Sequence, residues 1–150
     1  MGDSYANTDV FYSYYPCTGV DCNDGGFRNR MVVSTNTFND QLMPAMDYDR
    51  YGDVLVSFYD RRDDLNNILY HEYVSKFHAD GSDVQDQRVS ATASDPSFDP
   101  PPPNTVDPHF IGDYQDAWVW TYADGDRLVS AWAAASAGLA GEIHISRTLP

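Results

Sequence analysis

The chain has 150 residues, which suffices for one ordinary domain with its own hydrophobic core. Its 23 acidic and 9 basic residues leave a formal net charge of −14, so no basic stripe exists to neutralise phosphates, which argues against a nucleic-acid partner. No apolar run is long enough to span a bilayer, and the first ten residues lack the basic start and apolar core of a signal peptide, so we expect any export signal on sequence outside these residues.

The acids are almost all aspartate, with glutamate only at Glu72 and Glu142. Aspartate favours turns by bonding nearby backbone amides, whereas glutamate is a good helix former, so the composition predicts an all-β chain with many turns. The acidity itself fits either a solvated surface or carboxylate-lined calcium sites. No calcium loop is complete and no zinc spacing occurs, so no motif supports a metal site and we expect no cofactor.

Alternation and enrichment in β-branched and aromatic residues predict nine short strands. In chain order they are expected at 9–15, 28–35, 43–49, 53–60, 67–77, 86–91, 116–122, 126–132 and 142–147. Tight turns join most neighbours, which is typical of an up-and-down antiparallel order. A proline-rich insert at 95–108 precedes the last three strands, and its run Pro100–Pro103 is expected to form an extended surface spacer.

Two pairs of segments repeat within the chain. "DGGFRNRMVVS" at 24–34 superposes without a gap on "DGSDVQDQRVS" at 80–90, a spacing of 56 residues. "DVLVSFYD" at 53–60 resembles "DRLVSAWA" at 126–133, with Leu-Val-Ser followed by an aromatic in the seventh place.

The repeats and turns predict four-stranded sheets at the spacing of propeller blades. One complete blade spans 43–91, two strands of another lie at 9–35, and an incomplete last blade occupies 110–150. We therefore expect residues 1–150 to form a partial β-propeller of about two and a half four-stranded antiparallel blades. Its open sheet edges would need missing N-terminal blades, or self-association, to cover them. An independent two-sheet sandwich is the rival fold.

Up-and-down order also predicts which connections share a face of the molecule. The Asp-Gly turns at 24–25 and 80–81 should lie on one side, together with "DRYG" at 49–52 and "ADG" at 123–125. "YDRRDD" at 59–64 and "FIGDY" at 110–114 should meet on the other side.

Four segments resemble the sialidase-like propellers with BNR, or Asp-box, repeats, and look closest to the C-terminal blades of bacterial exported exo-sialidase-like proteins. They are "DQLMPAMDYDRYGDVLVSFYDRR" (40–62), "NNILYHEYVSKFHADG" (66–81), "QRVSATASDPS" (87–97) and "FIGDYQDAWVWTYADGDRLVSAW" (110–132). The family's repeat is Ser-x-Asp-x-Gly-x-Thr-Trp, and here both Asp-Gly turns lack the Thr-Trp. The Arg-Ile-Pro motif of the family's N-terminal blades is absent.

The resemblance implies a fragment of a glycoside hydrolase propeller that acts on extracellular glycans and is inactive in isolation. A non-catalytic module that binds glycan or protein is the alternative. It also implies a secreted, cell-surface or periplasmic location. The departures from the repeat leave the enzymatic assignment less specific than the fold.

Candidate site residues gather on the face that carries "YDRRDD". Arginine grips a sugar carboxylate by paired N–H bonds, and sialidases combine a tyrosine with acids for proton transfer. The resemblance therefore implies Asp113 and Tyr114 as catalytic residues. It implies contacts to the substrate from Arg61, Arg62, Asp60 and His109. In the alternative, the charges of "YDRRDD" pair with each other, Asp113 only fixes its loop, Tyr114 packs between blades and His109 is a loop residue.

The remaining reactive residues carry weaker predictions. Cys17 and Cys22 form a local disulfide if the protein is exported and stay free thiols if it is not. Trp118, Trp120 and Trp132 are expected in the core between neighbouring sheets. His71 and His144 look structural, and no Ser–His–Asp arrangement is recognisable in the sequence.

Overall fold

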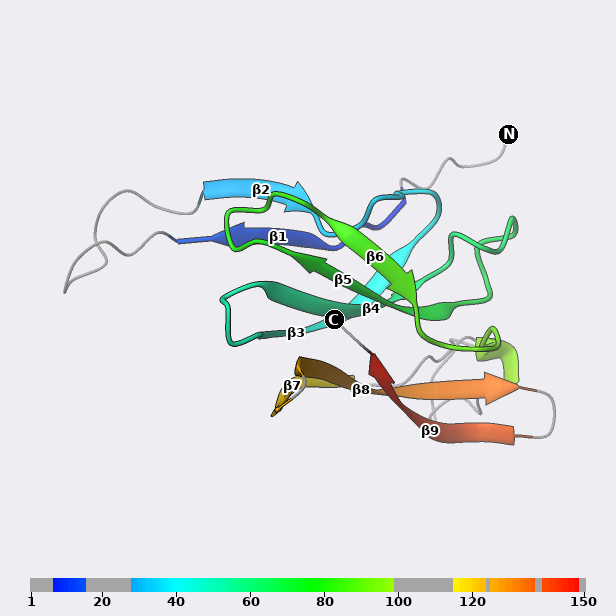
Figure 1. Ribbon diagram of the computed structural model, residues 1–150. Helices are drawn as coiled ribbons and strands as arrows, with labels where there is room; N and C mark the ends of the chain where they lie inside the picture. The colour runs from blue at the N-terminus through cyan, green and yellow to red at the C-terminus, as the bar shows by residue number, and fades with distance from the viewer. Residues whose placement is uncertain (1–6, 16–27, 99–114, 124, 137–138, 149–150) are drawn as a thin grey trace.

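The computed structural model describes residues 7–15, 28–98, 115–123, 125–136 and 139–148 (Figure 1). Within these ranges the chain is all-β, with no α-helix and with antiparallel pairing throughout. The strands are β1 Phe11–Tyr14, β2 Arg28–Val32, β3 Gln41–Tyr48, β4 Val54–Asp60, β5 His71–Phe77, β6 Gln85–Arg88, β7 Asp116–Tyr122, β8 Gly125–Ser136 and β9 Leu139–Thr148. One short 3₁₀ turn, η1, spans Pro96–Phe98. The predicted all-β class is confirmed, and no helix in the described ranges has the length and apolarity to cross a membrane.

The strands form three sheets, which we call the first sheet (β1–β2), the middle sheet (β3–β6) and the last sheet (β7–β9). This is the grouping of two, four and three strands that the turn pattern predicts. The largest boundary errors are four residues each: β5 is expected from residue 67 and observed from His71, and β8 is expected to end at residue 132 and ends at Ser136. Asn67 has a φ of 57°, so the backbone there is left-handed rather than extended.

The first strand of the middle sheet bends where the sequence contains a proline. Met43 has a φ of 52°, and the register of β3 against β4 shifts between Leu42 and Ala45. Pro44 cannot donate a ladder hydrogen bond, which suits an edge strand with a bulge. β3 is indeed an edge of the middle sheet, and it starts at Gln41 rather than at the predicted residue 43.

The two central strands of the middle sheet, β4 and β5, are buried on both faces because the other two sheets pack against the middle sheet (Figure 1). All seven residues of β4 are buried. Val54, Val56 and Phe58 face the first sheet, in a cluster that includes Val10 and Val33.

The opposite face of β4 packs on the last sheet. Leu55 lies in a cluster with Ala117 and Leu128, and Tyr59 lies in a cluster with Trp132. The Tyr59 hydroxyl accepts the Ala133 backbone N–H at 3.0 Å, which joins the two sheets by a polar contact as well. The three sheets thus form a stack of three layers.

The two sequence repeats differ in how the structure uses them. Val33 and Val89, matched by the first repeat, each pack toward the next sheet along the chain. Leu55 and Leu128, matched by the second repeat, instead meet across the interface between the middle and last sheets. If the two sheets were repeats related by a rotation, equivalent leucines would point in the same direction along the stack, and these two point toward each other. The Leu-Val-Ser match therefore does not mark equivalent positions in the two sheets.

The connections segregate as the strand order predicts. The β3–β4, β5–β6 and β7–β8 connections lie at one end of the stack, and the connection from β4 to β5 lies at the other (Figure 1). Arg50 of the β3–β4 turn donates its backbone N–H to Asp126 at the start of β8, at 2.8 Å. The turn at 24–25 and the segment 110–114 lie outside the described residues.

The prediction for the tryptophans is wrong at two of three positions. Trp132 is buried in the core, but the exposed fractions of Trp118 and Trp120 are 38% and 55%. Alternation along β7 explains the difference: Ala117 faces the middle sheet, so its neighbour Trp118 and then Trp120 point to the opposite side.

Candidate functional site

Half of the predicted site lies outside the described residues. Asp113, Tyr114 and His109 fall there, as do Cys17 and Cys22, so their predicted roles stay predictions. The described members are consecutive: Asp60 ends β4, and Arg61 and Arg62 begin the connection to β5.

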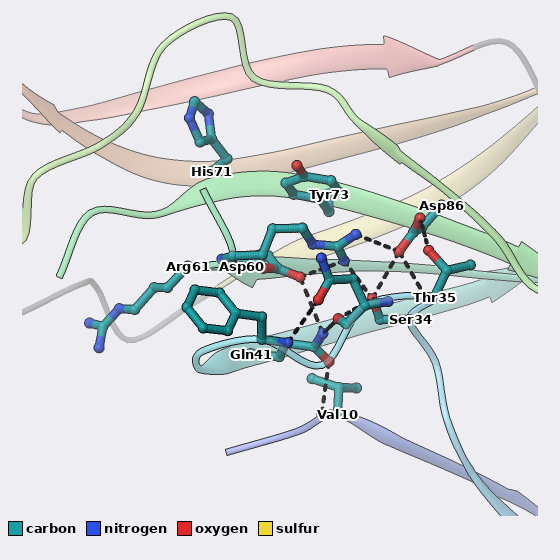
Figure 2. Close-up of polar contacts among 12 residues, drawn as sticks. Val10, Ser34, Thr35, Gln41, Asp60, Arg61, His71, Tyr73 and Asp86 are labelled. Atoms are coloured by element: carbon teal, nitrogen blue, oxygen red, sulfur yellow. Dashed lines mark hydrogen bonds and ion pairs between the residues drawn. The ribbon is translucent and has the colours of Figure 1, made fainter. Parts of the chain in front are cut away.

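Arg62 is the centre of a buried ion-pair network between the first and middle sheets, and Figure 2 shows its acidic partners Asp60 and Asp86. Its guanidinium donates to Asp60 Oδ2 at 2.6 Å and lies 2.8 Å from Asp86 Oδ2. It also donates to the Ser34 hydroxyl and sits 4.1 Å above the centre of the Tyr73 ring. Burial opposes the charge on Arg62, but the hydrogen bonds and charges of the two acids outweigh it and raise the pKa.

The two acids of this network are satisfied by further donors. Asp60 is fully buried; its Oδ1 accepts the Arg62 backbone N–H at 2.7 Å and its Oδ2 accepts Gln41 Nε2 at 3.2 Å. Asp86 accepts hydrogen bonds from Ser34 and Thr35 at the end of the first sheet. Burial disfavours its charge, but these donors together with Arg62 lower the pKa of Asp86. The network therefore fastens the first sheet to the middle sheet.

Arg61 is directed away from this network. In Figure 2 its side chain extends away from Asp60 and Asp86. Its Nη1 donates to the Asn67 carbonyl at 3.1 Å and lies 3.4 Å from Asp40 Oδ2. The two guanidinium groups therefore do not point to one position where both could bind the same carboxylate. Both guanidinium groups bond to groups of the chain itself.

A second, more exposed cluster surrounds Asp63, at the end of the stack where β4 joins β5. The Tyr73 hydroxyl donates to Asp63 Oδ2 at 2.9 Å, and Arg88 Nη1 approaches the same oxygen at 3.4 Å. Burial, followed by the bond to Asp63, raises the pKa of Tyr73 to about 12, so this hydroxyl is a donor at neutral pH. The side chains of Asp63 and Arg88 are 39% and 48% exposed, which leaves them accessible to a ligand.

The cavity beside this cluster is small. It has a volume of about 70 Å³ and is lined by Asp63, Asp64, Leu69, His71 and Ala93. Ligand pockets for small molecules usually measure roughly 300–1,000 Å³. The cavity by itself therefore does not enclose a sugar ring, and a glycan would have to lie across the open surface.

The structure also joins a serine, a histidine and an aspartate that the sequence did not link. His71 Nδ1 lies 2.9 Å from Ser90 Oγ, and His71 Nε2 lies 3.9 Å from Asp63 Oδ2. Ser90 is buried and its Oγ accepts the Glu72 backbone N–H at 3.0 Å. Burial lowers the pKa of His71. Because the serine is enclosed and the His–Asp distance exceeds a hydrogen bond, the arrangement fixes the β5–β6 register rather than activating a nucleophile.

Glu72 is a buried acid that sequence reasoning missed. It is fully buried on the face of β5 that meets the last sheet. Gln115 Nε2 donates to its Oε1 at 2.8 Å and also to Ser57 Oγ at 2.9 Å. Glu72 Oε2 has no partner, and neither has Gln115 Oε1. Burial raises the pKa of Glu72 to about 8, opposed only by the bond to Ser57.

The opposite end of the stack holds charges that pair among themselves. Lys76 Nζ lies 2.9 Å from Asp49 and 3.3 Å from Asp53, and His78 Nδ1 lies 2.7 Å from Asp53. Arg50 pairs with Asp126 through its guanidinium. A cavity of about 200 Å³ lies beside Lys76 and His78. Among the described residues no group of three or more His, Cys, Asp and Glu side chains is arranged to hold a metal ion.

No family model, curated protein or solved structure matches this chain. The resemblance to sialidase-like propellers therefore rests on the sequence segments alone.

Proposed function

We propose that this chain forms part of a sialidase-like β-propeller that acts on extracellular glycans, and that the chain by itself binds a glycan without cleaving it. The observation that carries the proposal is the stack of three antiparallel sheets, in which the middle sheet buries both faces. Blades of a propeller pack face to face in this way around a central axis.

The contact between the edge strands β3 and β7 supports the same architecture. Asp47 Oδ2 of β3 accepts the Val119 backbone N–H of β7 at 2.7 Å. Each of these strands is the first of its sheet along the chain. In a propeller the first strands line the axis and approach one another closely, whereas a two-sheet sandwich related by a two-fold axis along the strands would set β3 opposite β9.

The state of the arginines favours binding over turnover. Arg61 and Arg62 already bond to acids or carbonyls of the chain, so neither is poised to grip a sugar carboxylate. The accessible polar groups nearby are Asp63 and Arg88, which offer an acceptor and donors for sugar hydroxyls. This is the specific observation behind the second candidate function, a non-catalytic propeller module.

The test measures binding and turnover on the same protein. Calorimetric titration with a sialyl-oligosaccharide should give saturable binding, and a fluorogenic sialoside should give no release of fluorophore. Arg88→Ala should weaken binding at least several-fold, because it removes an exposed donor to an anionic sugar. Arg50→Ala, at the opposite end of the stack, is the matched control and should bind like the wild type.

Three results would change this view. Absence of binding to a panel of sialylated and neutral oligosaccharides would remove the glycan function. Turnover that is lost in Asp113→Asn would favour the hydrolase instead. Turnover undiminished in both Arg61→Ala and Asp113→Asn would overturn the predicted site.

A further inference from the structure

Three side chains approach the same carboxylate oxygen of Asp63, in the exposed cluster where β4 joins β5. The Tyr73 hydroxyl donates to Asp63 Oδ2 at 2.9 Å, Arg88 Nη1 lies 3.4 Å from that oxygen, and His71 Nε2 lies 3.9 Å from it. A carboxylate oxygen has two lone pairs, and the Tyr73 hydroxyl already occupies one of them. Arg88 and His71 therefore compete for the second.

The hydrogen bonds of His71 suit both of its charge states. Its Nδ1 lies 2.9 Å from Ser90 Oγ, which also accepts the Glu72 backbone N–H at 3.0 Å. A hydroxyl can donate one hydrogen bond and accept two. When the imidazole is neutral, the Ser90 hydroxyl can donate to Nδ1, and the ring proton is then on Nε2. When the ring is protonated, Nδ1–H donates to Ser90 and Nε2–H still faces Asp63, so His71 gains a proton without losing a hydrogen bond.

The charged groups around His71 come from three elements. They are Asp60 of β4, Asp63 and Asp64 of the β4–β5 connection, and Arg88 of β6. Asp60 is already paired with Arg62, and Asp64 accepts backbone N–H groups of its own connection. The hydroxyl of Tyr73, on the same strand as His71, stays neutral because its pKa is about 12. Asp63 is thus the acid near His71 whose pairing can change.

The charge of His71 depends on pH within the range where histidine normally titrates. Burial first, and then the charge of Arg88, lower the pKa of His71, whereas Asp63 and Asp60 raise it. His71 is therefore neutral at neutral pH and becomes charged below the ordinary pKa of histidine.

Protonation of His71 changes which cation is the better partner for Asp63. A neutral imidazole attracts the carboxylate less than the guanidinium of Arg88 does, but an imidazolium carries a full charge. The side chain of His71 is 10% exposed and fixed by Ser90, whereas that of Arg88 is 48% exposed. Pairing with Asp63 therefore costs His71 less side-chain entropy than it costs Arg88. The side chain of Asp63 is 39% exposed, which leaves it room to move toward His71.

We propose that protonation of His71 releases Arg88 from Asp63, and that the free guanidinium then binds an anionic glycan more tightly at acidic pH. The inference rests on the proposed glycan-binding function, because it describes how pH regulates that same site. Two changes strengthen binding together. Arg88 can direct its N–H groups at a sugar carboxylate, and the imidazolium adds a positive charge beside the ligand.

Calorimetric titration with a sialyl-oligosaccharide at about pH 5 and about pH 7.5 tests the proposal, because these values span the titration of histidine. The carboxylate of the ligand stays ionised at both. The wild type should bind about fivefold more tightly at the lower pH, the effect of one added charge near an exposed site. His71→Asn keeps a polar group beside Ser90 but cannot become charged, so its affinity should be the same at both pH values.

His78→Asn is the matched control for the titration. His78 lies at the opposite end of the stack, where its Nδ1 pairs with Asp53. This variant should keep the pH dependence of the wild type, and unfolding curves should show that both variants fold.

Titration of the histidine ring protons by NMR gives a second readout that needs no ligand. Asp63→Asn should lower the pKa of His71 further, because it removes the charge that favours the imidazolium. Asp53→Asn is the control: it should lower the pKa of His78, which Asp53 raises, and leave that of His71 unchanged.

The possible failures are distinguishable. Equal wild-type affinity at both pH values would leave the glycan function intact and overturn only the regulation by His71. The same holds if His71→Asn keeps the pH dependence, or if Asp63→Asn leaves the pKa of His71 unchanged. Absence of binding at both pH values would remove the glycan function, and the regulated site with it.

Discussion

The two faces of the middle sheet bury different kinds of polar group. Toward the first sheet, Arg62 is held between Asp60 and Asp86, and the acids receive further donors. Toward the last sheet, Glu72 is buried against Gln115, and each of these side chains keeps an oxygen without a partner. One interface thus contains charges that are paired, and the other contains an acid for which burial favours the neutral form.

The difference teaches how each interface should respond to change. Removing one member of a buried ion-pair network lowers the free energy of unfolding strongly, because the remaining charges stay buried without a partner of opposite charge. Replacing a buried neutral acid by a neutral side chain of the same shape changes the free energy of unfolding little at low pH. While the acid is present, however, the free energy of unfolding depends on pH. Each of the following substitutions tests one side of that contrast.

Arg62→Met should have the largest effect, a loss of about 3–5 kcal/mol in the free energy of unfolding. Methionine keeps much of the length of the side chain but removes the donors to Asp60 and Asp86 and the contact with the Tyr73 ring. Urea unfolding at neutral pH measures the loss.

Arg61→Met is the matched control for that experiment. Arg61 is the neighbouring residue. Its Nη1 forms an ion pair at 3.4 Å with Oδ2 of Asp40, whose side chain is partly exposed. We expect a loss of about 1 kcal/mol or less. Equal losses for the two variants would mean that the buried network contributes no more than an ordinary ion pair near the surface.

Glu72→Gln should stabilise the protein at neutral pH. The pKa of Glu72 is about 8 in the folded protein, against an ordinary value of 4.5, so the folded state binds a proton that the unfolded state releases. Stability from this group is fully present below pH 4.5 and is lost as the pH rises through 8, by about 1.4 kcal/mol per pH unit. The amide carries no such dependence, and its NH₂ can donate to Gln115 Oε1.

The measurement is the difference in unfolding free energy between wild type and Glu72→Gln at pH 5, 6, 7 and 8. Taking the difference cancels the contribution of other titrating groups, such as His78, whose pKa is raised by Asp53. The difference should grow steadily in favour of the variant, to roughly 3 kcal/mol at pH 7. A difference that stays constant with pH would show that Glu72 is ionised in the folded protein.

Sequence reasoning located the strands because their signals are local. Alternation placed β7 at the observed residues, and the turn before Val54 placed the start of β4 to within one residue. The same reasoning failed where a property depends on which side of a sheet is covered. Trp118 and Trp120 are as apolar as Trp132, and only the packing of the last sheet on the middle sheet separates them.

The polar contacts were harder still to predict, because they depend on distant partners. Arg62 and Asp86 are 24 positions apart in the sequence, and Glu72 meets Gln115 only because two sheets pack. The sequence alternative was that the charges of "YDRRDD" pair with each other, and Asp60 and Arg62 do so. Nothing local indicated Asp86 as the second acid. Glu72 alternates with Val74 and Lys76 on one face of β5, and this half-polar pattern gave no local signal that Glu72 is buried.

Among the three test substitutions, with the controls set aside, Gly81→Ala should give the smallest effect, and it tests how closely the first sheet approaches the middle sheet. Gly81 has a φ of 85°, and a Cβ there would overlap the Met31 side chain of β2. Gly52 has nearly the same φ, 86°, with open space around it. Gly52→Ala should therefore cost about 1 kcal/mol for left-handed backbone strain alone. Gly81→Ala should cost about 2 kcal/mol, because Met31 must also move, and its flexible side chain limits the added cost.

Thermal and urea unfolding of both variants measure the difference. Equal costs would mean that the β5–β6 turn and β2 are not packed together in solution, and that the first interface depends on the Arg62 network rather than on close packing at the turns.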